Sequence, residues 1–215
     1  MGNDIYIYYT RFSIKLKPET FNFLLKQLPR YLQTKIMRYR KWEDAHRSLL
    51  GKALLIYGLD YIGHDSYSLN DLKFTQFERP YFDNSIDFNI SHAGEYIICA
   101  ISTTNKIGID VEQVQNISLN DFKENFSQKE WKNILKADNI IQSFFIYWTR
   151  KEAFLKAIGM GLNVPLKNVD TTDNEITWDN KKWFLHEIKL DNDYVSYISC
   201  DAVLPEMVIK EINFN

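Results

Sequence analysis

One helical segment constrains the fold of this chain more than any other stretch. At 3.6 residues per turn, its apolar side chains form one stripe: Ile141, Phe144, Phe145, Trp148 and Leu155. Glu152 falls inside this stripe, where an unpaired carboxylate would cost on the order of several kcal/mol. We therefore expect a cation, a metal or a strong hydrogen-bond partner in front of Glu152, and Lys156, one turn further on, can flank the same site. The alternative is an exposed Glu–Lys pair on the helix surface.

The composition is that of a globular protein with a sizeable core. The chain has 215 residues, of which 45% are hydrophobic, enough for one domain or two small ones. The formal net charge of −2 and the lack of a run of about 18 apolar residues favour neither a nucleic-acid nor a membrane partner. Cys99 and Cys200 each lie in an apolar, strand-like run, so we expect two buried thiols and no disulfide. We interpret the chain as a soluble, cytoplasmic protein.

The first 105 residues contain both strand-like and helix-like segments. The pattern predicts a strand over 5–9, helices over 19–28, 30–41 and 43–57, and a hairpin of strands over 87–90 and 95–102. Gly58 is expected to end the third helix, and residues 91–94 are expected to form the turn of the hairpin. The segment 30–41 is strongly basic, which is typical of a solvated face, although such a patch can also receive a phosphate or an acidic partner. His46 and Arg47 lie near a helix N-terminus, where anions bind readily.

Two further acidic residues lie on a strand-like segment over 106–112. Alternation along a strand places Asp110 and Glu112 on one face and Ile109 and Val111 on the other. Two carboxylates this close repel each other unless a cation lies between them, and hard divalent cations such as Mg²⁺ prefer oxygen ligands. The segment therefore indicates either a metal site or an exposed, solvated sheet face.

The rest of the chain again mixes helices and strands. Ser127 and Glu130 have the spacing of a capping box for a helix that reaches about Ala137, and the helix that carries Glu152 is expected to begin near Ile140. Strand-like segments follow near residues 167–171, 182–189, 194–201 and 207–212.

The order of elements repeats along the chain. Residues 1–105 and residues 106–215 each run from a strand, through helices that end in glycine, to a hairpin whose second strand holds a cysteine. We therefore predict an α+β fold of two similar halves related by a pseudo-twofold axis, divided between residues 105 and 106. A ligand site is expected in the cleft between the halves, with Asp110 where the second half begins.

Six motifs occur in one order across residues 35–162. They are WEDAHRSLLG (42–51), RP (79–80), FNISHAG (88–94), IGIDVE (107–112), WTRKEAFLK (148–156) and GMGL (159–162). In this order and spacing the chain resembles the 4'-phosphopantetheinyl transferases, specifically the two-halved Sfp-type group that activates peptide-synthetase and related carrier proteins. The resemblance implies transfer of the phosphopantetheine arm from coenzyme A to a serine of an acyl or peptidyl carrier protein, with release of adenosine 3',5'-bisphosphate.

The resemblance also implies roles for the acidic residues and for Lys156. Mg²⁺, or Mn²⁺ in its place, would be held by Asp110, Glu112 and Glu152 together with the pyrophosphate of coenzyme A. Glu152 would act as the base for the serine hydroxyl, and Lys156 would stabilise the departing phosphate. Asp110, Glu152 and Lys156 are thus the expected catalytic residues, and Asp110 and Lys156 are also expected to contact coenzyme A. Because one chain holds both walls of the cleft, we expect a monomer.

The remaining contacts to coenzyme A would come from the first half. Those expected at its 3'-phosphate end are Lys35, Arg47, Ser48 and His92. Those expected near its phosphates or adenine are Arg79, Pro80 and Ser91. Two positions depart from the family pattern: Leu32 stands where a second lysine is common, one turn before Lys35, and Arg79 replaces the lysine of a common Lys-Pro pair. Arginine keeps the charge but changes the reach and geometry.

Two other classes of function share part of these features. A different Mg²⁺-dependent phosphoryl-transfer enzyme could use the same Asp-x-Glu pair, and a non-enzymatic module could bind coenzyme A or a carrier protein. A module without activity would be expected to lose Glu152 or Lys156, and this chain has both. The basic segment 30–41 could suggest RNA binding, but no aromatic–glycine RNA signature accompanies it.

Overall fold

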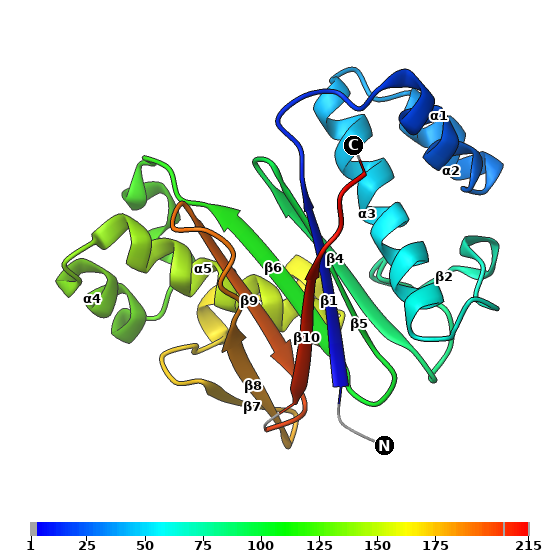
Figure 1. Cartoon of the computed structure of the whole chain (residues 1–215). Coiled ribbons are helices and arrows are strands. Elements are labelled where there is room, and N and C mark those ends of the chain that lie inside the picture. Colours follow the sequence, from blue (N-terminus) through cyan, green and yellow to red (C-terminus); the bar gives the residue numbers. More distant parts are fainter. Residues whose placement is uncertain (1–3, 204, 215) are drawn as a thin grey trace.

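The computed structural model describes residues 4–203 and 205–214 of the chain. They form an α+β fold in which two four-stranded sheets lie side by side, with helices on their outer faces (Figure 1). The first sheet has the order β10-β1-β5-β4, with β1 (Asp4–Arg11), β4 (Asp87–Ala93), β5 (Tyr96–Ser102) and β10 (Glu206–Glu211). The second has the order β6-β9-β8-β7, with β6 (Ile107–Gln113), β7 (Glu175–Trp178), β8 (Lys181–Glu187) and β9 (Tyr194–Cys200). A short ribbon pairs β2 (Lys73–Phe74) with β3 (Pro80–Tyr81).

The helices of the described residues fall into two groups. Those of the first half are α1 (Pro18–Lys26), α2 (Arg30–Met37), α3 (Trp42–Tyr61) and the 3-10 turn η1 (Leu69–Asp71). Those of the second half are η2 (Leu119–Asn125), α4 (Gln128–Lys136), α5 (Ile140–Ile158), η3 (Gly161–Asn163) and η4 (Leu166–Asn168). The predicted capping box of Ser127 and Glu130 at the start of α4 is confirmed. Among the described residues, no helix is long and apolar enough to cross a membrane.

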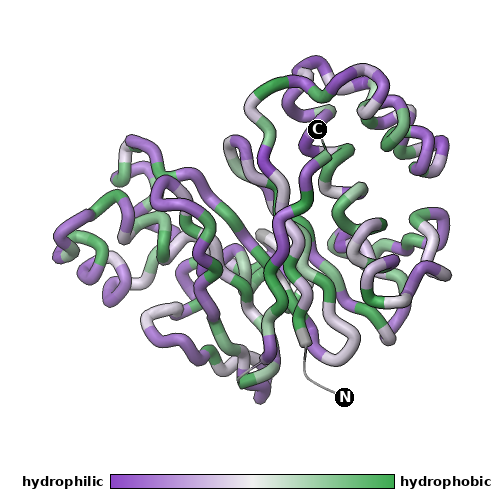
Figure 2. Tube along the Cα trace, in the orientation of Figure 1, coloured by the Kyte–Doolittle hydropathy of each residue, from purple (hydrophilic) through white to green (hydrophobic). Residues whose placement is uncertain are grey.

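Three apolar clusters hold the layers together. One lies between α3 and the first sheet and includes Tyr8 and Leu54, and a second lies between α5 and the second sheet and includes Phe154. The third fills the space between the two sheets and includes Ile7 and Ile109. Figure 2 shows the corresponding concentration of hydrophobic residues along the central strands. Since burying each large aliphatic side chain contributes roughly 1.5–3 kcal/mol, the shared cluster fixes the two sheets relative to each other.

Side chains of β4 also join the first sheet to β6 of the second. The Asp87 and Asn89 carboxylate and amide oxygens accept hydrogen bonds from the backbone N–H groups of Ile107 (2.8 Å) and Ile109 (3.0 Å). Two residues further along β4, the Ser91 hydroxyl donates to Asp110 Oδ1 at 2.8 Å. Alternate residues of a strand face the same side. These three side chains of β4 therefore all face β6, and their hydrogen bonds hold β6 in a fixed position beside the first sheet.

Three boundaries in the first half differ from the sequence prediction. Helix α3 runs through Gly58 to Tyr61, because Gly58 serves close packing rather than termination: a Cβ at Gly58 would lie 2.6 Å from Tyr8 Cε2. The basic helix ends earlier than predicted, at Met37. Strand β4 continues through Ser91 and His92 to Ala93, and its turn is made at Gly94, where φ is +52°.

The second half also differs from its predicted strands. Residues 167–171 do not form a strand, because the carbonyls of Leu166 and Val169 accept hydrogen bonds from the buried Lys151 ammonium instead of a neighbouring strand. Strand β7 was not expected. The last strand, β10, pairs in parallel with β1, so the C-terminal segment lies in the sheet of the first half. Cys99 and Cys200 are free and buried, as predicted.

Candidate active site

The predicted acidic residues meet Lys156 where α5 packs on β6. Gly108 makes this packing close, because a Cβ there would lie 2.7 Å from the backbone carbon of Lys156. The Lys156 ammonium donates to Asp110 Oδ1 at 2.6 Å and to Ser91 Oγ at 2.9 Å. One ammonium thus connects the carboxylate of β6 with the hydroxyl of β4, across the junction of the two sheets.

Glu112 and Glu152 lie in the same electrostatic environment. Burial raises the pKa of Glu112 to about 7, and the neighbouring carboxylates of Asp110 and Glu152 add to the rise, although Trp148 Nε1 donates a hydrogen bond to Glu112 Oε1 at 3.2 Å. Burial and Asp110 likewise raise the pKa of Glu152. If all three carboxylates ionise, their negative charge exceeds what the single ammonium of Lys156 neutralises, and this repulsion contributes to the raised pKa values of the two glutamates.

The acidic cluster formed by Asp110, Glu112 and Glu152 fits the donor set of a hard divalent cation. Asp110 Oδ2 is buried and has no hydrogen-bond partner, which is costly for a charged oxygen unless a cation approaches it. Within residues 4–203 and 205–214, however, no group of three or more His, Cys, Asp or Glu side chains is already arranged to hold a metal. The chemistry of the residues suits a metal, and the structure pairs Asp110 with Lys156.

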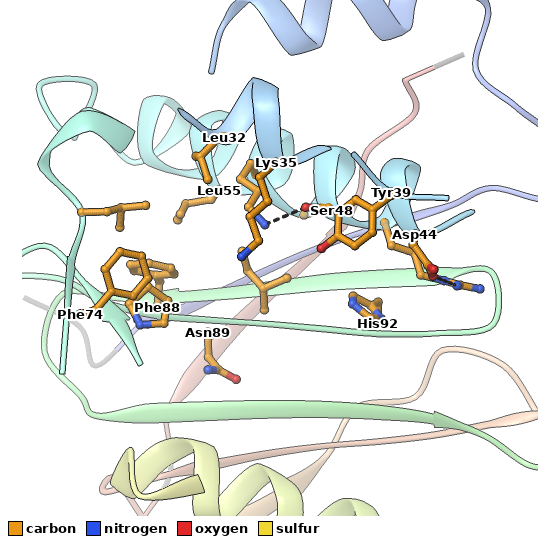
Figure 3. A pocket seen from close by; sticks show the side chains of 16 residues that line it. Leu32, Lys35, Tyr39, Asp44, Ser48, Leu55, Phe74, Phe88, Asn89 and His92 are labelled. Atoms are coloured by element: carbon orange, nitrogen blue, oxygen red, sulfur yellow. Dashed lines mark hydrogen bonds and ion pairs between the residues drawn. The ribbon is translucent and has the colours of Figure 1, made fainter. Parts of the chain in front are cut away.

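A cavity of about 390 Å³ lies on the other side of β4, between that strand, α2 and α3. It is lined by five of the residues expected to bind coenzyme A, namely Lys35, Arg47, Ser48, Pro80 and His92. Figure 3 shows Lys35 reaching toward the strand that carries Asn89 and His92, with Phe74 and Phe88 grouped at one end. The cavity thus has a basic end and an apolar, aromatic end.

The basic end of the cavity is only partly neutralised by the protein. Arg47 donates to the carbonyl of Gly94 at 2.9 Å and to Asp44 Oδ1 at 3.1 Å. His92 lies at the rim of the cavity, and its ring is partly desolvated by the residues around it. This desolvation lowers the pKa of His92, and the cations Arg47, Lys156 and Lys52 lower it further. Asp44 is the one acidic side chain lining this cavity among the described residues. An anion entering the cavity would find several cations and one carboxylate.

Arg79 and Ser91, which were also expected near coenzyme A, lie elsewhere. The Arg79 guanidinium forms two hydrogen bonds with the Asp87 carboxylate, at 2.8 and 2.9 Å, and donates to the carbonyls of Ile107 and Lys156. Arg79 therefore joins β4, β6 and α5, and these contacts use four of its five N–H donors. Ser91 belongs to the contact with Asp110 and Lys156 described above.

The sequence analysis assigned no role to two lysines that the structure places near the site. Lys52 lines the cavity one turn after Ser48 on α3, a spacing that could have identified it, and its ammonium donates to Ser48 Oγ at 3.3 Å. Lys151 is fully buried and pairs with the equally buried Glu130 at 2.8 Å. Because Lys151 precedes Glu152 on α5, this ion pair connects the part of α5 that carries Glu152 to the start of α4. No periodicity signals a buried ion pair of this kind.

His46 has a structural role in the first half. Its ring is buried, with Nε2 accepting from the Leu16 backbone N–H at 3.1 Å and Nδ1 lying 2.8 Å from the carbonyl of Trp42. Burial lowers the pKa of His46. Both ring nitrogens are engaged, so His46 does not contribute to anion binding as its position near the helix N-terminus suggested.

The fold and the site together define a two-halved α+β protein. The acidic cluster and Lys156 lie at the junction of its two sheets, and the basic cavity lies on the other side of β4. A family model described as the 4'-phosphopantetheinyl transferase superfamily matches residues 106–198, and one described as 4'-phosphopantetheinyl transferase, N-terminal, matches residues 15–104. The 4'-phosphopantetheinyl transferase gsp of Aneurinibacillus migulanus is 33% identical over 169 residues, 75% of this chain and 70% of that protein. The chain therefore belongs to the 4'-phosphopantetheinyl transferase superfamily.

Other similar proteins carry related names. The 4'-phosphopantetheinyl transferase Sfp of Bacillus subtilis is 37% identical over 140 residues, 61% of this chain and 60% of that protein. The L-aminoadipate-semialdehyde dehydrogenase-phosphopantetheinyl transferase of Saccharomyces cerevisiae is 28% identical, over 91% of this chain and 78% of that protein. The solved holo-[acyl-carrier-protein] synthase of Thermotoga maritima has a TM-score of 0.35 and 18% identity, over 48% of this chain and 64% of that chain.

Proposed function

We propose that this protein transfers the 4'-phosphopantetheine arm of coenzyme A to a serine hydroxyl of an acyl or peptidyl carrier protein and releases adenosine 3',5'-bisphosphate. One observation carries the proposal: the basic cavity and the acidic cluster with Lys156 lie on the two sides of the same strand, β4. A substrate with an anionic nucleotide at one end and a reactive pyrophosphate further along matches this order of sites.

Coenzyme A would enter with its nucleotide in the cavity. The apolar end, with Phe74 and Phe88, suits the adenine ring, and the basic end, with Lys35 and Arg47, suits the 3'-phosphate. The pyrophosphate would then pass His92 at the rim toward Lys156 on the far side of β4. In this pose the nucleotide anchors the substrate and does not react.

The acidic cluster and Lys156, at the junction of the two sheets, would perform the chemistry. The serine oxygen attacks the phosphorus that carries the pantetheine arm, and the bond from this phosphorus to the bridging oxygen breaks. Glu152 takes the serine proton, and burial together with Asp110 raises its pKa, which makes it a stronger base than an exposed carboxylate. Lys156 faces the departing phosphate and stabilises the charge that develops on it. Asp110, Glu112 and Glu152 would hold Mg²⁺ or Mn²⁺, which supplies charge neutralisation at phosphoryl oxygens.

The protein partner in this proposal is a carrier-protein domain, and the enzyme works as a cytoplasmic monomer. Its halves are residues 1–105 and residues 106–215, except that the last strand, β10, joins the sheet of the first half. Both walls of the proposed site come from one chain, and Arg79 ties them together through β4, β6 and α5. A second copy is therefore not needed to complete the site.

Product formation tests the proposal. The protein is mixed with coenzyme A, Mg²⁺ and an apo-carrier protein that Sfp of Bacillus subtilis modifies, and adenosine 3',5'-bisphosphate is measured by chromatography. We expect release of this nucleotide that requires the carrier protein and stops when a chelator is added. Binding of coenzyme A with no release under conditions where Sfp is active would instead indicate a non-enzymatic binding module.

A further inference from the structure

The cations that line the cavity differ from the expected set at two positions. Leu32 on α2 stands where a second lysine was expected, and it lines the cavity together with Lys35. Lys52 on α3 lines the same cavity and supplies an ammonium that no motif predicted. The cavity thus lacks a cation on α2 but gains one on α3.

We propose that Lys52 is a phosphate-binding residue of this enzyme and that it supplies to the 3'-phosphate of coenzyme A the second ammonium that Leu32 cannot supply. The inference rests on the proposed function, because it concerns how the same cavity holds the same substrate. It assigns to Lys52 a contact that determines specificity for coenzyme A over analogues without the 3'-phosphate.

The surroundings of Lys52 leave its charge poorly satisfied in the free protein. An ammonium has three donors, and among the described residues the hydrogen-bond partner of Lys52 is Ser48 Oγ alone, at 3.3 Å. Lys35 faces the cavity from α2, Arg47 and Asp44 face it from α3, and His92 and the hydroxyl of Tyr39 complete its titratable lining. A half-buried cation beside other cations is costly unless an anion joins them.

A purely structural role explains Lys52 less well. A lysine that only covers apolar surface keeps its ammonium in water, as exposed lysines normally do. Burial and the charge of Lys35 instead lower the pKa of Lys52 to about 8. A phosphate dianion would remove this penalty, since charge-assisted hydrogen bonds favour the protonated amine.

Proton uptake is therefore an expected signature of the contact. Near pH 8 part of the Lys52 population is neutral in the free protein, and binding of the 3'-phosphate raises the pKa of Lys52, so protons are taken up. The pKa of His92 is lowered from a value that already lies below 7, so its titration falls below this pH.

Calorimetric titration of the full chain at pH 8, in two buffers of different ionisation enthalpy, measures both affinity and proton uptake. Coenzyme A is compared with dephospho-coenzyme A, which lacks the 3'-phosphate. For Lys52→Leu we expect the dissociation constant of coenzyme A to rise about tenfold or more, that of dephospho-coenzyme A to stay within about threefold, and proton uptake to disappear. Lys52→Gln provides the same comparison if the leucine variant does not fold.

Two further variants make the test specific. Adding Leu32→Lys to Lys52→Leu returns an ammonium to the cavity from α2 and should recover most of the lost affinity for coenzyme A. Lys26→Gln removes a charge from the exposed side of α1 and should leave both ligands unaffected. These variants separate a local contact from a change in net charge.

The outcomes distinguish this inference from the proposed function. If the Lys52 variants weaken both ligands equally, or leave coenzyme A binding and proton uptake unchanged, the assignment of Lys52 is wrong while coenzyme A remains a ligand. If the native protein binds neither ligand, the proposed function itself fails.

Discussion

Gly108→Ala tests whether close packing of α5 on β6 aligns the active site. A Cβ at Gly108 would lie 2.7 Å from the backbone carbon of Lys156 and nearer still to backbone atoms of Ala157 and Ala153. Helix backbone atoms cannot rotate out of the way individually, as a flexible side chain can. The substitution therefore forces α5 as a whole away from β6, and with it Glu152 and Lys156 away from Asp110.

The size of the effect follows from the contact distances. Ordinary contacts of a Cβ begin near 3.4 Å, so α5 has to retreat by about 1 Å. Overpacking of this kind costs about 1–3 kcal/mol of stability. A displacement of catalytic groups by about 1 Å can lower the rate about a hundredfold. We expect a lower melting temperature and a kcat about a hundredfold lower, with the KM for coenzyme A little changed because the cavity lies on α2, α3 and β4.

Gly58→Ala is the matched control for Gly108→Ala. Its Cβ would lie 2.6 Å from Tyr8 Cε2, so it also overpacks a helix against a sheet, but under α3 and away from α5. Thermal unfolding and initial rates of carrier-protein modification at saturating coenzyme A are measured for both variants. We expect both to lose stability but only Gly108→Ala to lose kcat. Equal losses of kcat, or a fully active and stable Gly108→Ala, would refute the alignment argument.

Three other predictions follow from the same geometry. Lys156→Ala should lower kcat about a hundredfold, whereas Lys35→Ala should mainly raise the KM for coenzyme A; steady-state kinetics that show the reverse would contradict the two roles. Lys151→Met should destabilise the protein by about 3–5 kcal/mol in urea unfolding, because Glu130 is left buried and unpaired, and adding Glu130→Gln should recover part of the loss. The lowered pKa of Lys52 means that the unfolded chain binds more protons between about pH 8 and 10.5, so stability of the ligand-free protein should rise with pH across this window relative to Lys52→Leu; equal slopes would contradict the shift.

Local patterns were sufficient to predict which acidic residues come together at the junction of the two sheets. Helical periodicity identified Glu152 as a carboxylate on an apolar stripe, and strand alternation placed Asp110 beside Glu112. Both signals depend only on residues within a few positions of each other, so the tertiary fold could not obscure them. The family resemblance added the expectation that Lys35 and His92 contact the same ligand, and both residues line one cavity.

Features that depend on distant partners could not be predicted in this way. Lys52 is indistinguishable from a surface lysine in sequence until α2 packs beside α3. Arg79 matched a ligand-binding motif, yet its partners come from β4, β6 and α5 and engage its guanidinium. A glycine at position 58 is typical of a helix end. Only the packing of Tyr8 against Gly58 shows that this glycine permits a close approach instead. The position of β10 beside β1 likewise depends on the completed sheet.

Intact-mass spectrometry of an apo-carrier protein tests the central claim most directly. The carrier protein is incubated with this protein, coenzyme A and Mg²⁺, with Glu152→Gln as the inactive control and Sfp of Bacillus subtilis as the active one. The account predicts that the carrier gains the mass of one phosphopantetheine group with the native protein and does not with Glu152→Gln. The account would be contradicted if this protein binds coenzyme A but leaves the mass unchanged for every member of a panel of carrier proteins that Sfp modifies.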